Sequence, residues 1–154
     1  MTLHLSQSRA VPVSVDEAFV GVLEHPLPEI FRRRMLAMPP IREVRGQIGP
    51  WREVGQTRTI VTADGGTLLE TLTSVERPHR AAYSIGDVRG PMRPLVERIE
   101  GRWSFEPVGT GTRITWQWDV TPTSAGRLAM PAFARMWRGY ARQALEEVES
   151  VLLR

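Results

Sequence analysis

Two segments in the second half of the chain alternate apolar and polar residues most regularly. Every second residue from Ile114 to Val120 is apolar within residues 112–120, and the same holds from Ile99 to Phe105 within residues 96–106, apart from Gly101. Because successive strand residues point to opposite faces of a sheet, both segments are predicted strands with one buried face. The intervening Gly109-Thr110-Gly111 predicts that they form an antiparallel hairpin.

The rest of the chain predicts more strands and three helices. Ser14 and Glu17 form a capping-box pattern, so a helix is expected from Ser14 until Pro26 ends it. A second short helix is expected at residues 28–34. Apolar residues recur every three or four positions over residues 133–151, which predicts a long amphipathic helix. Pro131 either opens this helix or kinks a longer one. Further strands are predicted at residues 3–13, 42–47, 56–62, 67–75 and 80–85.

Length and composition predict one domain spanning residues 1–154. The chain has no cysteine, which excludes disulfides, thiolate nucleophiles and cysteine-based metal sites. Its three histidines are dispersed, so we expect no metal ion and no cofactor. Neither a secretory signal nor an apolar run long enough for a membrane span is visible, and a cytoplasmic protein without stable membrane insertion is expected.

All 20 basic residues are arginine, against 17 acidic residues, for a net charge of +3. Arginine titrates very high, so this small excess alone pushes the sequence pI to about 10.4. Three arginines are adjacent at residues 32–34, and three neighbours at a helix end cannot all face one way. A solvated helix end explains them better than a polyanion site. We therefore expect no nucleic-acid partner.

Four of the five tryptophans are expected to converge on one volume. Trp103, Trp116 and Trp118 share the inner face of the predicted hairpin, under the helix that carries Trp137. This pattern favours either a solid aromatic core or the wall of a cavity. Gly101, between apolar neighbours on the same face, leaves room beneath the helix or marks a bulge.

Two carboxylates fall in register with inward apolar residues. Glu70 lies between Leu68 and Leu72, and Glu97 precedes Ile99 in the same alternation. A buried unpaired carboxylate is costly, so such a group is normally solvated, paired or functional. The alternatives for both are a pairing with an arginine or an edge position that faces water.

Three segments resemble a known superfamily. Residues 11–19 (VPVSVDEAF) are similar to its opening, where a first strand runs into a helix. Residues 64–78 are similar to its central hairpin, and residues 101–116 to its last one. The chain is therefore identified as a member of the START-like (SRPBCC) superfamily, most similar to polyketide cyclase/dehydrase-like proteins.

The resemblance implies an α+β helix-grip fold. Its curved seven-stranded antiparallel sheet wraps around a long C-terminal helix, and two short helices follow the first strand. It also implies a hydrophobic cavity between sheet and helix, usually taking a lipid, polyketide, sterol or other apolar molecule. The superfamily includes carriers, sensors and cyclases, so the fold leaves the function open.

Two functions remain as hypotheses. The first is binding of a hydrophobic small molecule by a monomer or homodimer. The second is an aromatase/cyclase-type enzyme for aldol cyclisation and dehydration, with Glu70 or Glu97 as base and Tyr83 or an inward arginine as donor. No Ser/His/Asp arrangement is present, which favours binding. The expected ligand-binding residues are Glu70, Tyr83, Glu97, Trp103, Trp116, Trp118, Phe133, Trp137 and Tyr140.

Overall fold

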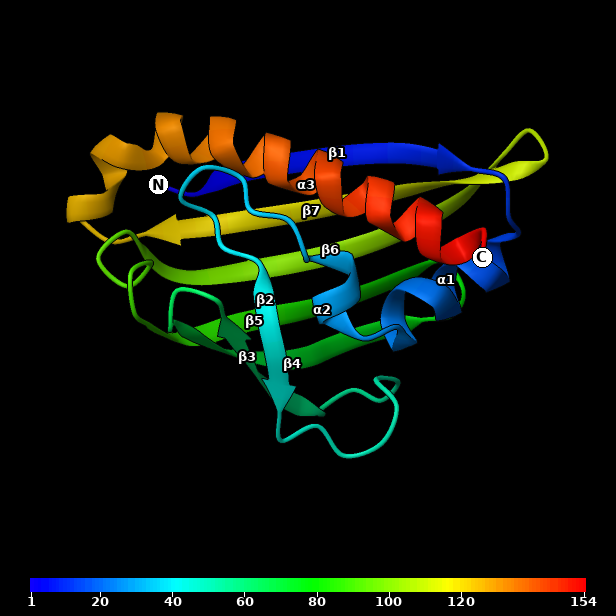
Figure 1. The fold of residues 1–154 in the computed structure, drawn as a ribbon, viewed down its shortest axis with the longest axis horizontal. Helices are drawn as coiled ribbons and strands as arrows, with labels where there is room; N and C mark the ends of the chain where they lie inside the picture. The colour runs from blue at the N-terminus through cyan, green and yellow to red at the C-terminus, as the bar shows by residue number, and fades with distance from the viewer.

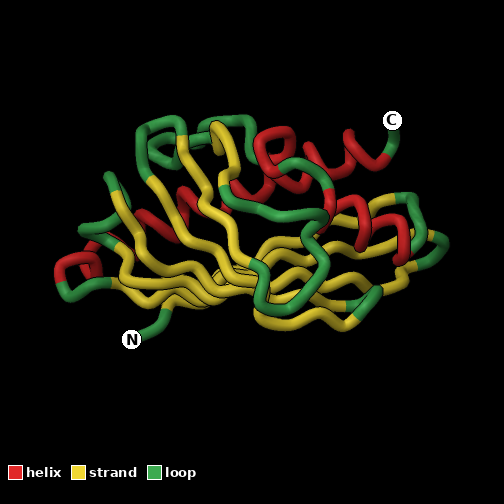
Figure 2. The backbone as a smooth tube through the Cα atoms, turned by 90° about the horizontal axis from the view of Figure 1, so that it is seen from below, coloured by secondary structure: helices red, strands yellow, loops and turns green.

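The strands form one antiparallel sheet in the computed structural model, which describes residues 1–154. Seven strands follow the order β1-β7-β6-β5-β4-β3-β2, so the first strand lies beside the last one (Figure 1). Figure 2 shows that the sheet is strongly curved, with the helices on one side of it. The strands are β1 (Leu3–Val11), β2 (Ile41–Arg45), β3 (Thr57–Thr62), β4 (Thr67–Glu76), β5 (Arg80–Arg89), β6 (Val96–Val108) and β7 (Gly111–Pro122).

Two short helices follow β1, as predicted. Helix α1 (Val15–Glu24) begins after Ser14, whose hydroxyl accepts a hydrogen bond from the Glu17 amide at 3.1 Å. Helix α2 (Leu27–Ile30) is a single turn and ends before the arginines at residues 32–34. The prediction of a helix over residues 28–34 is therefore wrong in extent. Arg33 instead donates to Glu146 of the C-terminal helix at 2.8 Å.

The long helix α3 (Met130–Leu152) runs along the sheet (Figure 1). Pro131 lies in its first turn, and a short 3₁₀ helix, η1 (Ala125–Ala129), precedes it. Pro131 thus opens the helix rather than kinking it, which fits a residue that lacks an amide donor. None of the helices combines the length and hydropathy that crossing a bilayer requires.

The inward face of the last hairpin forms much of the core. Ile99, Phe105, Ile114 and Val120 are buried, and β6 and β7 pair from Val96 to Val108 as the alternation predicts, apart from one register shift near Val96. Polar side chains of the same strands lie on the opposite face. The core therefore lies between one face of the sheet and α3. A cavity lies in the same layer.

Candidate functional site

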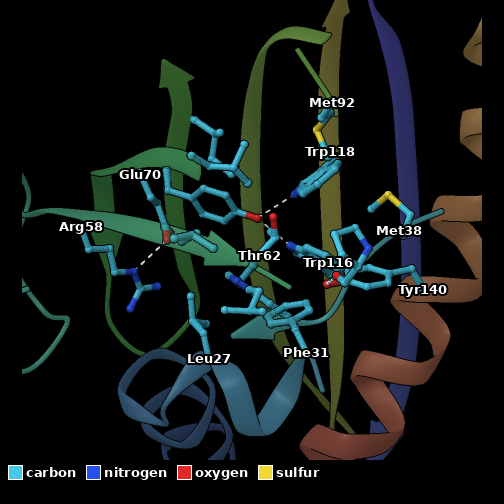
Figure 3. A pocket seen from close by; sticks show the side chains of 17 residues that line it. Leu27, Phe31, Met38, Arg58, Thr62, Glu70, Met92, Trp116, Trp118 and Tyr140 are labelled. Atoms are coloured by element: carbon cyan, nitrogen blue, oxygen red, sulfur yellow. Dashed lines mark hydrogen bonds and ion pairs between the residues drawn. The ribbon is translucent and has the colours of Figure 1, made fainter. Parts of the chain in front are cut away.

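A cavity lies between the inner face of the sheet, the segment after α2 and helix α3 (Figure 3). Thirteen of its 17 lining residues are hydrophobic. Measured as the space open to the centre of a water molecule, its volume is about 60 Å³. That is well below the roughly 300–1,000 Å³ of pockets that enclose drug-sized ligands. We call it the aromatic cavity.

Aromatic rings form its wall. Trp103 and Trp116 stack with centroids 5.3 Å apart and an angle of 11° between their planes. Phe31, from the segment after α2, lies 5.1 Å from Trp116 and stacks on Tyr140 of α3 at 5.8 Å. These are typical separations for favourable aromatic pairs. The rings therefore border the cavity from both the sheet and the helix side.

Two predicted wall residues lie elsewhere. Trp137 is fully buried behind the wall, 5.0 Å from Trp116 and 5.8 Å from Trp118, and does not line the aromatic cavity. Phe133 stacks on Trp118 at 6.5 Å and lines a neighbouring cavity. The aromatic cluster is thus divided: its helix-side part at Trp137 is solid core, and its sheet-side part borders open space.

The hydroxyl of Tyr83 is the central polar group of the aromatic cavity. Trp116 Nε1 donates to it at 2.7 Å and Trp118 Nε1 at 2.8 Å, shown as dashed lines in Figure 3. Tyr83 lies on β5 opposite Gly101 of β6, which in turn lies opposite Trp118 of β7. Burial raises the pKa of the Tyr83 hydroxyl well above its usual range, with a further contribution from the nearby Glu70 carboxylate. Tyr83 therefore stays protonated at neutral pH.

A buried ion pair lies on the strands beside Tyr83. Arg58 of β3 is directly opposite Glu70 of β4, and its Nε donates to Glu70 Oε1 at 2.8 Å. Arg58 also donates to Gln47 at 3.1 Å, and its guanidinium lies 3.9 Å from the ring centroid of Trp51. Burial raises the pKa of Glu70, while the charge and hydrogen bond of Arg58 oppose that rise. The expected inward position of Glu70 is confirmed, and its partner is an arginine.

Glu97 does not face the cavity, and the prediction that it does is wrong. The pairing of β6 with β7 shifts by one residue between Val96 and Arg98, which is a β-bulge. The bulge reverses the alternation at this point, so Val96 is buried and Glu97 is exposed. Glu97 is thereby removed as a candidate base and as a ligand contact.

A second cavity, of about 90 Å³ in the same measure, adjoins the aromatic cavity. Met38, Thr62, Leu68 and Met92 are among the residues that line both. The second cavity also contacts Arg89, and a smaller share of its lining is hydrophobic. Methionine side chains are flexible, so Met38 and Met92 form an adaptable partition between the two spaces.

The segment at residues 31–40 closes the aromatic cavity against α3. The Tyr140 hydroxyl donates to the Pro39 carbonyl oxygen at 3.0 Å, and burial raises the pKa of Tyr140 above its usual range. Arg32 donates to Glu147 at 2.8 Å, which holds the pKa of that carboxyl below its usual range. These contacts fix the segment on the helix.

No group of three or more histidine, aspartate or glutamate side chains that could hold a metal ion is present in the structure.

Comparison with protein families identifies one match over nearly the whole chain. The family described as "Polyketide cyclase / dehydrase and lipid transport" matches residues 2–152. The chain belongs to this family. The expected START-like membership is thereby confirmed, although the family description itself spans both catalysis and transport.

Several solved structures share the fold of this chain, although their sequence identity to it is low. A protein of Thermus thermophilus is 17% identical, with a TM-score of 0.72 over 98% of this chain and 97% of that one. Ara h 8.0201 is 13% identical, with a TM-score of 0.71 over 99% of both chains. The major latex-like protein 151 of Panax ginseng is 11% identical, with a TM-score of 0.70 over 99% of both chains. Comparison with curated proteins finds no match.

The structure brings six of the nine expected residues to the aromatic cavity of this family member: Glu70, Tyr83, Trp103, Trp116, Trp118 and Tyr140. Sequence reasoning missed Arg58, although the alternation of β3 places it in register with the inward Ile60. It also missed Phe31 and Met38, which come from a segment with no periodic pattern. Their apolar character was the only available signal, and it does not specify what they contact.

Proposed function

We propose that this protein binds an apolar, ring-containing small molecule in the aromatic cavity. The observation that carries the proposal is the combination of aromatic walls with a buried hydroxyl and a neutralised ion pair. A mostly apolar concave site with a few fixed polar groups is typical of small-molecule binding sites. The volume of about 60 Å³ favours a small ligand, or one that displaces the methionine partition to reach the second cavity.

Blocking the cavity tests this proposal. Leu68 faces both cavities, whereas its neighbour Leu69 is 39% exposed on the other face of β4. Leu68→Phe should therefore abolish binding of tetralin, a two-ring hydrocarbon, while Leu69→Phe should leave it unchanged. Binding is followed by calorimetry and by tryptophan fluorescence, because Trp103, Trp116 and Trp118 line the site.

Native mass spectrometry of the protein purified from its source provides a second measurement. A co-purifying apolar molecule that is retained in Leu69→Phe and lost in Leu68→Phe supports the proposal. It is contradicted if neither tetralin nor its ketone 1-tetralone shows saturable binding and no small molecule co-purifies. Equal binding by the two variants would place the ligand outside the aromatic cavity.

A second candidate function is enolisation chemistry of the kind a cyclase or dehydratase needs. The supporting observation is that the Glu70 carboxylate and the Tyr83 hydroxyl line the same cavity. Glu70 would remove a proton from the carbon beside a ketone, and Tyr83 would stabilise the enolate oxygen. The ion pair with Arg58 weakens Glu70 as a base, which is why we place binding first.

Deuterium exchange separates this candidate from binding alone. If Glu70 acts as a base, the protein should accelerate exchange of the α-protons of 1-tetralone in D₂O, measured by NMR. Glu70→Gln should abolish that acceleration while 1-tetralone still binds. Exchange at the buffer rate with the parent protein, or unchanged acceleration in Glu70→Gln, would eliminate Glu70 as a base.

A further inference from the structure

The Tyr83 hydroxyl has used both of its lone pairs within the protein. Indole nitrogens donate hydrogen bonds and do not accept them, so the bonds from Trp116 and Trp118 occupy the acceptor positions of the phenolic oxygen. The hydroxyl proton remains, and the protein supplies no acceptor for it. Toward the cavity, Tyr83 therefore presents a donor and no acceptor.

The surrounding strands hold this donor in place. The Tyr83 ring lies over Gly101, where a Cβ atom would overlap it. Trp116 and Trp118 are alternate residues of β7, so their indole groups project from the same face of one strand. Two donated hydrogen bonds polarise the hydroxyl and strengthen the bond that it can donate.

The other two hydroxyl groups of the cavity lining already have acceptors. The Tyr140 hydroxyl donates to Pro39, and the Thr62 hydroxyl donates to Asp64 at 2.6 Å. Arg58 and Glu70 neutralise each other's charge. Tyr83 is thus the hydroxyl of the lining whose proton has no acceptor within the protein.

We infer that the ligand is a flat ring compound with a hydrogen-bond-accepting oxygen, such as a ketone, quinone or phenol, that receives the Tyr83 proton. The stacked rings of the aromatic wall favour the planar ring system. The donor-only character of Tyr83 favours an acceptor oxygen and disfavours an N–H group at the same position. This inference rests on the proposed function and specifies the ligand class of that site.

Ligands of matched size test the inference. Tetralin has no polar atom, 1-tetralone adds a carbonyl acceptor, and 1,2,3,4-tetrahydroquinoline adds an N–H donor. We expect Tyr83→Phe to weaken 1-tetralone binding by about 3- to 10-fold, the usual net value of one hydrogen bond, with tetralin and tetrahydroquinoline changed less than about twofold. Thr115→Val is the control, because it removes a hydroxyl that lies outside the cavity lining and bonds Ser8 of β1 at 2.9 Å. It should leave the ratio of 1-tetralone to tetralin affinity unchanged.

An infrared spectrum provides a readout that does not depend on the stability of a variant. The carbonyl stretch of ¹³C-labelled 1-tetralone bound to the parent protein should lie below its value in an apolar solvent. An unshifted stretch, or an unchanged affinity ratio in Tyr83→Phe, would overturn the inference while leaving the proposed function intact. If neither tetralin nor 1-tetralone binds the parent protein and no small molecule co-purifies with it, the proposed function fails and the inference fails with it.

Discussion

The ring of Tyr83 lies directly over Gly101, at the position that a side chain would occupy on any other residue. The two residues pair across β5 and β6, and Gly101 pairs in turn with Trp118 of β7. The missing side chain on the middle strand lets a tyrosine on one neighbour reach tryptophans on the other. Gly101 has no positive φ, so space rather than backbone freedom explains this glycine.

Gly101→Ala should therefore displace the Tyr83 ring and break its hydrogen bonds to Trp116 and Trp118. Overpacking of this kind typically costs about 1–3 kcal/mol. Gly86→Ala is the matched control, since Gly86 also lies in a strand interior, has no positive φ, and has open space where its Cβ would be. It should change stability by less than about 1 kcal/mol. Guanidinium unfolding followed by fluorescence measures both, and equal effects would show that the Tyr83 contact does not matter.

The Arg58–Glu70 pair predicts strongly non-additive mutations. Arg58→Met leaves a buried carboxylate without its partner, which typically costs about 3–5 kcal/mol. The double variant Arg58→Met/Glu70→Leu removes both charges and should be more stable than Arg58→Met alone. A double-mutant cycle on the free energy of unfolding measures the difference. Additive effects would mean that the two side chains do not interact.

The same pair predicts a pH dependence in Arg58→Met. Without Arg58, burial is left to raise the folded-state pKa of Glu70 above its unfolded value of about 4.3. A carboxyl with a raised folded-state pKa contributes its full stability below the unfolded pKa, and loses it as the pH rises through the folded pKa. The unfolding free energy of Arg58→Met should thus fall more steeply than that of the parent as the pH rises above the unfolded pKa of about 4.3. The double variant is the control and should lack this extra slope.

The regular strands are the part of the fold that could be predicted from sequence. In β7, alternation alone places Trp116 and Trp118 inward, and the tight turn at Gly109 fixes the register with β6. The same alternation correctly places Glu70. It fails at Glu97 because a bulge adds one residue to the strand, and nothing in the local composition marks where a bulge occurs.

Arg58 shows a different limit. Its register with Ile60 indicates an inward position, yet its charge indicates an outward one. The inward position is realised because Glu70 lies directly opposite and Trp51 covers the guanidinium. Neither partner is adjacent to Arg58 in the sequence, so the balance depends on tertiary contacts. The same holds for Trp137, because the pattern of α3 indicates that it is buried but not whether it borders a cavity.

The two tyrosines of the chain should resist titration in the folded protein. Tyr83 and Tyr140 are the only tyrosines, and burial raises the pKa of both. Phenolate absorbance should stay absent past about pH 10, where an unfolded tyrosine titrates, and then rise together with the loss of structure. Protonated tyrosines in the folded state ionise on unfolding, so stability is retained below about pH 10 and is lost above it. Gradual titration near pH 10 in a folded protein would contradict the burial, and the guanidinium-unfolded chain serves as the reference.

The methionine partition predicts how the site responds to larger ligands. Met92 lines both cavities, whereas Met136 lines only the second one. Met92→Ala should join the two spaces and raise the affinity for anthrone, a three-ring ketone, severalfold relative to 1-tetralone, since each additional buried CH₂-sized group contributes about 0.8 kcal/mol. Met136→Ala removes the same side chain without opening the partition, so it should not change that ratio. Calorimetric titration of the two ketones measures it. An equal gain in both variants would show that extra volume alone sets the ligand size, and that Met92 does not separate the cavities.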